Sequence, residues 1–246
     1  MDHISDYNVD GGLLSLGEFI FLEILSEMQL PQDVQQFLIL NKKTFKLILH
    51  SRYARIIQSK FQISPVFIIK QESQGSSDEK KFIHSDKGEF STIAINPLIS
   101  EGIVRIEVVF ENNVICSKFI GIADATCSFA ACKWPWEDGN DKKIVRYSDG
   151  VLYHITNGIR GNQDYADGQR VAVEVDMTTV PRKVTFFVDD IEQPNFVIGI
   201  PEAIRFWAYI TNSSSSFTVT KFERLIQSTA KGVEGSKAFE WGKQWK

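Results

Sequence analysis

The period of the hydrophobic pattern changes once along the chain, near residue 63. Before that point apolar residues recur at spacings of three and four, for example over residues 45–61. This period is typical of amphipathic helices, and Pro31, after Leu30, can begin a new helix. Short helices with wide apolar faces are unstable alone, so we predict a small three-helix region over 1–63.

After residue 82 apolar and polar residues alternate. The alternation is clearest over residues 104–110 and 171–177, and shorter apolar segments follow at 183–188, 205–210 and 217–220. Strict alternation indicates half-buried strands, and no helical pattern lies between them that could form parallel βαβ units. We therefore predict a mainly β protein whose largest part is an antiparallel β-sandwich.

Turn residues separate these strands. Asp189-Asp190 is predicted to form the tip of a hairpin, because aspartate tolerates turn geometry through local hydrogen bonds. Ser148-Asp149-Gly150, Asn157-Gly158 and Asp167-Gly168 are further predicted turns.

Four regions follow from these patterns. We expect a helical region at 1–63, a linker with a first strand and a polar loop at 64–81, a sandwich at 82–226 and a tail at 227–246. The polar stretch 71–81 is interpreted as a linker or exposed loop. The aromatic residues of the tail allow two alternatives, packing on the sandwich or fraying.

Composition narrows the function classes. Charged residues make up 24% of the chain and the net charge is −4, which argues against coating of nucleic acid or anionic membrane. No signal peptide or membrane-length apolar run is present, so we expect an intracellular, cytoplasmic, soluble protein. Cys116, Cys127 and Cys132 are interpreted as reduced thiols, although Cys127 and Cys132 are close enough in sequence to bridge.

Motifs for catalysis and cofactor binding are missing from the sequence. It contains no nucleophile elbow, phosphate loop or dinucleotide fingerprint. His3, His50, His84 and His154 stand too far apart to form a metal-spaced cluster. We therefore expect no enzyme activity, no cofactor and no metal.

The order of sequence features in the β region resembles that of SPRY domains over about residues 82–226. Gly121 lies in a strand similar to the family's "iGv" strand, and Asp189-Asp190 replaces the family's usual Asn-Gly hairpin tip. The similar stretches are residues 102–110, 118–123, 146–154, 165–176, 183–190 and the closing pair 206–210 and 217–222. The resemblance implies a lectin-like, non-catalytic module that captures a short peptide or protein surface through loops at one edge of its sandwich.

Two loops match the positions where this resemblance implies binding. The loop 125–141 contains Lys133, Trp134 and Trp136, and tryptophan is over-represented at interaction hot spots. The alternative is that these tryptophans cap the core. The loop 211–216 is polar, and the alternative there is a solvated turn without a ligand. Its candidate binding residues are Thr211, Asn212, Ser213 and Ser214.

The helical region resembles a divergent F-box. Glu23-Ile24-Leu25 and Lys42 match the family pattern, whereas Phe21 stands at its first proline position and Phe45 comes one residue late. The resemblance implies binding to the small adaptor subunit of a cullin–RING ubiquitin ligase. The alternative is a helical extension that packs on the sandwich. The residues assigned to adaptor binding are Ile20, Leu22, Ile24, Leu25, Leu30, Pro31 and Val34.

Three hypotheses for function remain open. The leading one is the substrate receptor of a ubiquitin ligase, and a narrower one is a SPRY scaffold with no ligase role. The third is a carbohydrate-binding lectin-like sandwich, for which Trp134, Trp136, Asp138 and Asn140 supply an aromatic platform and polar groups.

Overall fold

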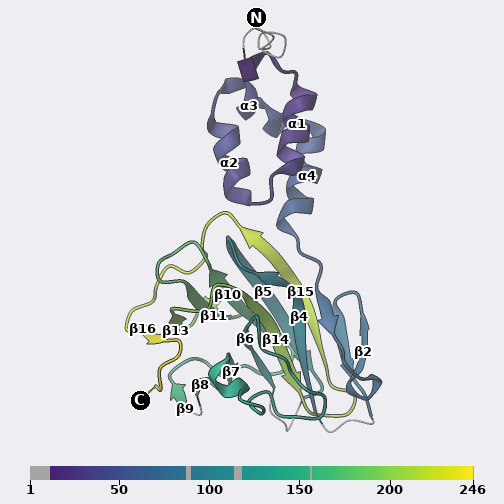
Figure 1. Ribbon diagram of the computed structural model, residues 1–246, viewed down its shortest axis with the longest axis vertical. Coiled ribbons are helices and arrows are strands. Elements are labelled where there is room, and N and C mark those ends of the chain that lie inside the picture. Colours follow the sequence, from purple (N-terminus) through teal and green to yellow (C-terminus); the bar gives the residue numbers. More distant parts are fainter. Residues whose placement is uncertain (1–11, 87–89, 114–117, 156, 246) are drawn as a thin grey trace, which may run out of the picture. The chain divides into compact units, whose positions relative to one another are not determined.

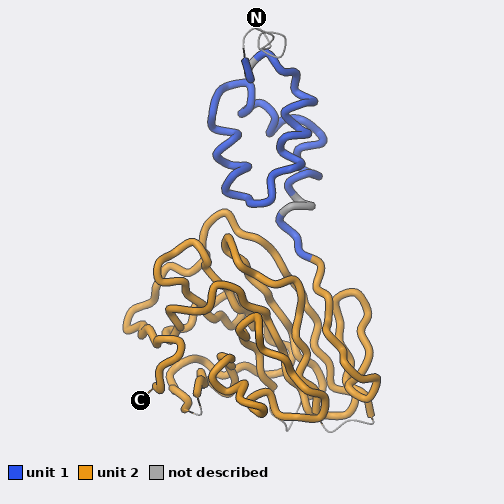
Figure 2. Tube along the Cα trace, in the orientation of Figure 1, with its two compact units in different colours: residues 1–63 blue, residues 64–246 orange. Residues whose placement is uncertain are grey.

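The computed structural model describes residues 12–86, 90–113, 118–155 and 157–245 (Figure 1). Cys116 and His3 lie outside these residues. The chain divides into two compact units, the helical unit Met1–Ile63 and the β unit Ser64–Lys246 (Figure 2). The predicted fold class is confirmed, since most strands form two antiparallel sheets and a small helical region precedes them.

The described part of the helical unit holds four α-helices, one more than predicted. The third predicted segment is divided, because His50 has an extended backbone with ψ 135°. Its imidazole Nδ1 accepts a hydrogen bond from the Arg52 N–H at 3.1 Å, as a cap does at a new helix. The bounds are η1 (Gly12–Ser15), α1 (Glu18–Glu27), α2 (Pro31–Ile39), α3 (Lys42–Lys46), η2 (Leu47–Leu49) and α4 (Ser51–Phe61).

The helical unit has its own apolar core. The Phe21 ring meets the Phe37 ring edge to face, with centroids 5.9 Å apart. Pro31 begins α2, as predicted. Within the described residues, no helix is both long and apolar enough to cross a lipid bilayer. The buried residues of this core are Phe21, Leu22, Leu25, Val34, Phe37, Leu38 and Leu47.

The β unit consists of a seven-stranded and a nine-stranded sheet. In spatial order the seven-stranded sheet is β1 (Val66–Ile68), β4 (Ser91–Ile99), β14 (Ile204–Ile210), β6 (Phe119–Asp124), β7 (Ile144–Ser148), β8 (Val151–His154) and β9 (Asn157–Arg160). The nine-stranded sheet is β16 (Lys237–Glu240), β13 (Asn195–Ile198), β11 (Lys183–Val188), β10 (Arg170–Asp176), β5 (Ile103–Glu111), β15 (Ser216–Leu225), β3 (Lys81–His84) and β2 (Gly75–Asp78), with β12 (Ile191–Glu192) paired to β11.

Aromatic and β-branched side chains fill the space between the two sheets. Phe206 of β14 contacts Phe222 of β15 with ring centroids 5.7 Å apart. Tyr147 of β7 contacts Phe186 of β11 at 5.3 Å. These contacts join one sheet to the other, so the predicted alternation does place one residue in two in a shared core.

Two of the predicted hairpin turns are confirmed. Asp189 and Asp190 have positive φ values of 48° and 66° and join β11 to β12. Asp149 and Gly150 join β7 to β8.

The predicted turn at Asn157-Gly158 is wrong, because both residues belong to β9. His154 pairs with Asn157, so the chain reverses between these two residues. A Cβ on Gly158 would lie 2.5 Å from the Tyr153 ring. This glycine is therefore explained by a close side-chain approach and not by a turn.

The prediction of a linker or loop over 71–81 is wrong as well. This stretch contains η3 (Glu72–Gln74), β2 and the start of β3. Strand β2 lies at the edge of its sheet and is largely exposed, so its residues can be polar on both faces.

The C-terminal tail packs on the β unit. Strand β16 pairs in parallel with β13. Trp245 is buried, and its Nε1–H donates to the carbonyl of Glu240 at 2.9 Å. Of the two alternatives for the tail, the structure therefore selects packing.

Candidate functional site

The outer face of the seven-stranded sheet carries a second aromatic layer. Phe206 points to the core, so its neighbour Trp207 and the next alternate residue, Tyr209, point outward. Phe119 of β6 pairs with Tyr209, and their rings stack with centroids 5.0 Å apart. These rings are buried, so another part of the chain must pack on this face of the sheet.

The loop 125–141 supplies the cover. Phe129 packs on Trp207 with ring centroids 5.3 Å apart, and Trp136 meets Phe119 edge to face at 6.0 Å. Trp136 is half-buried. For Trp136 the structure therefore supports the alternative of a core cap.

Trp134 lies differently from Trp136. Its ring stacks on Phe90 at 5.0 Å, on Trp136 at 4.8 Å and on Tyr209 at 5.5 Å, yet 36% of the residue remains exposed. We call Phe90, Trp134, Trp136 and Tyr209 the aromatic shelf. The shelf presents an exposed indole that is already held by three other rings.

Hydrogen bonds hold the loop in place around Trp134. The backbone N–H of Trp134 donates to Glu137 Oε1 at 2.9 Å. Lys133 Nζ forms an ion pair with Asp138 at 2.7 Å, and this hydrogen bond raises the pKa of Lys133. Lys133 therefore stands at the rim of the shelf with its charge already paired.

A half-buried arginine supports the shelf from the side. The Arg146 guanidinium carbon lies 4.2 Å from the Trp136 ring centroid and 4.5 Å from that of Tyr153. Burial lowers the pKa of Arg146 to about 10, so the side chain remains charged at neutral pH. The two rings stabilise this cation, which in turn fixes the orientation of Trp136.

The polar loop 211–216, which we call the serine loop, begins two residues after Tyr209 and so is close to the shelf in sequence. Ser213 and Ser214 hydroxyls both donate to Asp86 Oδ1, and these bonds lower the pKa of Asp86. Thr211 Oγ1 is buried and has no hydrogen-bond partner among the described residues, and Asn212 is half-buried. The two serines are thus engaged within the protein, which favours the alternative of a structural turn.

The residues assigned to adaptor binding fall into two groups. Leu22, Leu25, Pro31 and Val34 are buried inside the helical unit, where a partner would not reach them. Ile20 is exposed, whereas Ile24 and Leu30 are half-buried. Among its described residues, the large apolar side chains that the helical unit exposes are Leu13, Phe19, Ile20, Ile39, Leu40, Phe45, Ile48 and Leu49.

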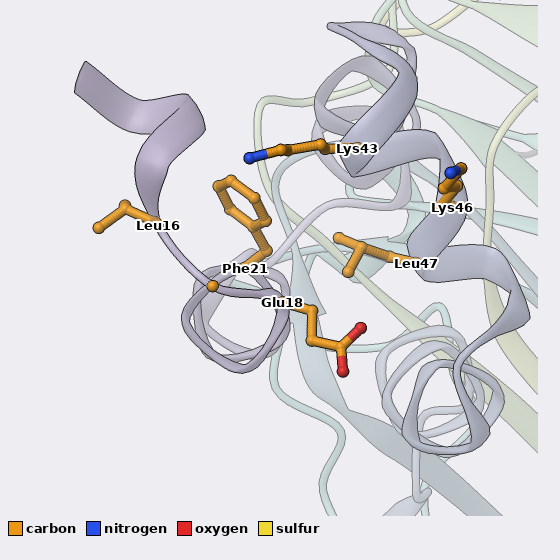
Figure 3. Close-up of a pocket in the computed structure, with 7 residues that line it drawn as sticks. Leu16, Glu18, Phe21, Lys43, Lys46 and Leu47 are labelled. Atoms are coloured by element: carbon orange, nitrogen blue, oxygen red, sulfur yellow. The ribbon is translucent and has the colours of Figure 1, made fainter. Parts of the chain in front are cut away.

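A shallow cavity of about 300 Å³ lies in the helical unit (Figure 3). Phe21 and Leu47 form its apolar side, while Lys43 and Glu18 extend to either side of them in Figure 3. Phe21 thus serves both the core of the helical unit and this cavity wall.

Sequence reasoning did not name Phe90 or Tyr209 as members of the site. The pairing of β4 with β14 and the fold of the loop 125–141 bring them to Trp134. Phe90 and Tyr209 both lie more than 40 positions from Trp134 in sequence, so no local pattern indicates these contacts. Cys127 and Cys132 are free thiols, as predicted. No cluster of three metal-ligating side chains occurs among the described residues.

No protein-family model and no curated protein matches this sequence. Among solved structures, the SPRY domain of human HERC1 is similar at 15% identity and a TM-score of 0.42, over 61% of this chain and 91% of that one. The TRIM65 PSpry domain is similar at 10% identity and 0.48, over 68% and 94%. Stonustoxin is similar at 10% and 0.47, over 67% of this chain and 28% of that chain. At such identities these likenesses concern the fold alone.

Proposed function

We propose that the β unit is a SPRY-type interaction module that captures a short peptide or protein surface on the aromatic shelf. The observation that carries this proposal is the state of Trp134, which is 36% exposed although three rings stack on it. The ordered motifs over residues 82–226 support the same interpretation.

The energetic argument rests on preorganisation. An exposed indole supplies a large apolar surface, and burial of aromatic side chains dominates many interfaces. Trp134 is already fixed by stacking and by its backbone bond to Glu137, so a ligand does not have to order it. Binding of this kind requires no reactive group.

The carbohydrate alternative is less consistent with the geometry. Asp138 is paired with Lys133, and Asn140 is buried with its Nδ2 donating to the carbonyl of Ser128 at 3.2 Å. Trp136 is covered by Trp134 and Arg146. The polar groups that would hold sugar hydroxyls are therefore already engaged.

Panning a random peptide library against the full chain tests the peptide proposal. We expect enriched peptides whose affinity falls at least about 30-fold in Trp134→Ala, the loss typical of a hot-spot residue. Ile191→Ala, which truncates an exposed apolar residue on β12, is the matched control and should bind normally. Equal affinity in Trp134→Ala, with an unchanged melting temperature, would reject the shelf, and enrichment on a glycan array alone would favour the lectin alternative.

We propose a second function for the helical unit, docking to the small adaptor subunit of a cullin–RING ubiquitin ligase. The supporting observation is its large exposed apolar set, in which Leu49 is 87% exposed and Ile39 and Leu40 are adjacent. A contiguous exposed apolar patch marks an interaction site, and Ile39 and Leu40 supply two neighbouring residues for one. Together the two proposals describe a substrate receptor.

Mixing the purified full chain with the purified adaptor at micromolar concentration tests this second proposal. We expect a binary complex by size-exclusion chromatography, and its loss when Ile39 and Leu40 are both changed to aspartate. Val180→Asp, at an exposed position of the β unit, is the control. Absence of a complex with the unaltered chain would leave a scaffold with no ligase role.

A further inference from the structure

A cleft lies on the outer face of the seven-stranded sheet, beside the aromatic shelf. Its walls come from the end of β1, from β4 and β14, and from the first part of the loop 125–141. The volume is about 290 Å³, at the lower limit of ligand pockets, which suits one or two side chains better than a large cofactor.

Two cations line this cleft. Lys70 Nζ donates to Ser128 Oγ at 2.6 Å, and Arg205 donates from Nε to Asn96 Oδ1 at 2.8 Å and from Nη1 to the carbonyl of Ala125 at 2.9 Å. All of these acceptors are uncharged. No aspartate or glutamate belongs to the described residues that line the cleft.

The acidic residue closest in sequence to the cleft loop, Asp124, does not line the cleft and forms no ion pair with Lys70 or Arg205 in the described part of the chain. Asp124 Oδ1 accepts hydrogen bonds from the backbone N–H and the hydroxyl of Thr126, at 2.8 and 2.6 Å. The Cys127 thiol adds no negative charge, because burial raises its pKa to about 11. The cleft therefore carries positive charge that its own residues do not neutralise.

One of the residues that line the cleft, Thr92, has an unpaired hydroxyl. Thr92 is only 2% exposed, and its Oγ1 has no hydrogen-bond partner among the described residues. Burying a hydroxyl without a partner is costly, and valine would fill the same space without that cost. The unpaired hydroxyl is therefore consistent with a bound ligand that supplies the missing hydrogen-bond partner.

The cleft and the shelf share one pair of strands. Thr92 pairs with Tyr209 across β4 and β14, and Tyr209 is a member of the shelf. An extended peptide that contacts Trp134 can thus place another side chain over Thr92. Ile68, Ala94 and Phe129 provide apolar walls for the methylene groups of such a side chain.

We propose that this cleft receives the carboxylate side chain of an aspartate or glutamate in the captured peptide, between Lys70, Arg205 and Thr92. This inference rests on the proposed peptide-binding function. The two cations supply charge complementarity, and the Thr92 hydroxyl supplies a further donor.

The test uses small probes that need no identified target. N-acetyl-aspartate methylamide and N-acetyl-glutamate methylamide are titrated into the isotope-labelled full chain, and the amide signals of Ala94 and Cys127 are followed by NMR. The asparagine and glutamine methylamides and inorganic phosphate are titrated in parallel. We expect saturable shifts with the carboxylates, and roughly tenfold weaker binding of the neutral amides.

Two variants assign the effect to the cleft. Lys70→Gln should weaken carboxylate binding roughly tenfold, and Thr92→Val should weaken it several-fold while raising the melting temperature. A stabilised variant that binds less tightly cannot be explained by misfolding. Lys237→Gln, an exposed lysine on β16, is the matched control and should bind as the unaltered chain does.

Several results would overturn the inference. These are the absence of saturable shifts, equal affinity for carboxylate and amide probes, unchanged affinity in both variants, or tighter binding of phosphate at the same amides. Such a failure would leave peptide capture by Trp134 standing. Conversely, probe binding without any enriched library peptide would reject the proposed function and keep the anion site.

Discussion

At the scale of single residues, Gly121 shows a position where only the smallest residue fits. A Cβ there would lie 1.9 Å from the carbonyl oxygen of Val145 and 3.1 Å from the Cα of Arg146. Both atoms belong to the backbone of β7, the strand paired with β6. The clash can therefore be relieved only by separating two central strands.

We expect Gly121→Ala to lower the free energy of unfolding by about 3 kcal/mol or more, at the upper end for overpacking. Urea unfolding followed by tryptophan fluorescence measures this change. Ile191→Ala, at a 60% exposed position of the same unit, is the control and should cost under about 0.5 kcal/mol. Similar losses in the two variants would contradict the steric explanation.

At this scale the sequence could predict which tryptophans belong to the site but not how exposed each of them is. Trp134 and Trp136 could be named because two tryptophans in a polar loop are unusual in themselves. The distinction between an exposed Trp134 and a half-buried Trp136 depends on Phe90 and Tyr209, which only strand pairing brings to them. The unpaired hydroxyl of Thr92 is likewise visible only when its surroundings are known.

At the scale of elements, several interior strands were predictable and the edge strands of the nine-stranded sheet were not. Strands β5 and β10 alternate because one face packs in the core, whereas β2 and β16 lie at the two edges of their sheet and are largely exposed. Exposed strands have no need for an apolar face, so their sequences carry little signal. Within the helical unit, the extended backbone of His50 divides one periodic segment into separate helices. The apolar residues keep their helical spacing across His50, so the sequence pattern does not indicate the break.

Residues 237–245, which we call the β16 segment, pack on the rest of the β unit through contacts with a neutral histidine. His154 is buried between the rings of Trp241 and Trp245, at centroid distances of 4.9 and 5.3 Å. The Gly242 N–H donates to its Nε2 at 2.8 Å, so the proton sits on Nδ1, which donates to the carbonyl of Ile144. Burial lowers the pKa of His154, and the Ile144 carbonyl and the Asp141 carboxylate oppose this effect in part.

We expect the β16 segment to loosen as the pH falls from about 7.5 to about 5. The unfolded histidine takes up its proton near pH 6.5, whereas the folded one resists protonation. Stability is therefore complete above about pH 6.5 and is lost as the pH falls from there through the lower pKa of the folded state. A protonated Nε2 can no longer accept from Gly242, so hydrogen exchange of that amide should accelerate beyond its intrinsic pH dependence.

Two variants separate this effect from other titrations. In His154→Gln the protection of the Gly242 amide, corrected for intrinsic exchange, should no longer depend on pH. The pKa of His84 is also lowered by burial, and His84→Gln should leave the pH response of Gly242 intact. A Gly242 amide equally protected at both pH values would show that His154 does not hold the segment.

At the scale of the whole molecule, the two units have separate cores of unequal size. The helical unit depends on a small set of buried residues around Phe21 and Leu25, whereas the β unit has a core between two extended sheets. A unit of about 60 residues is stable by only roughly 3–5 kcal/mol. All five tryptophans lie in the β unit, so their fluorescence reports on that unit alone.

We therefore expect Leu25→Ala to unfold the helical unit and leave the β unit intact. Leu25 is 0% exposed, and truncating such a leucine costs about 2–5 kcal/mol, comparable to the whole stability of a unit this small. Circular dichroism at the helical minimum should lose its signal while tryptophan fluorescence stays native. Leu49→Ala, at an 87% exposed position, should change neither signal. If fluorescence and circular dichroism instead shifted together in Leu25→Ala, the two cores would have to be coupled into one cooperative structure.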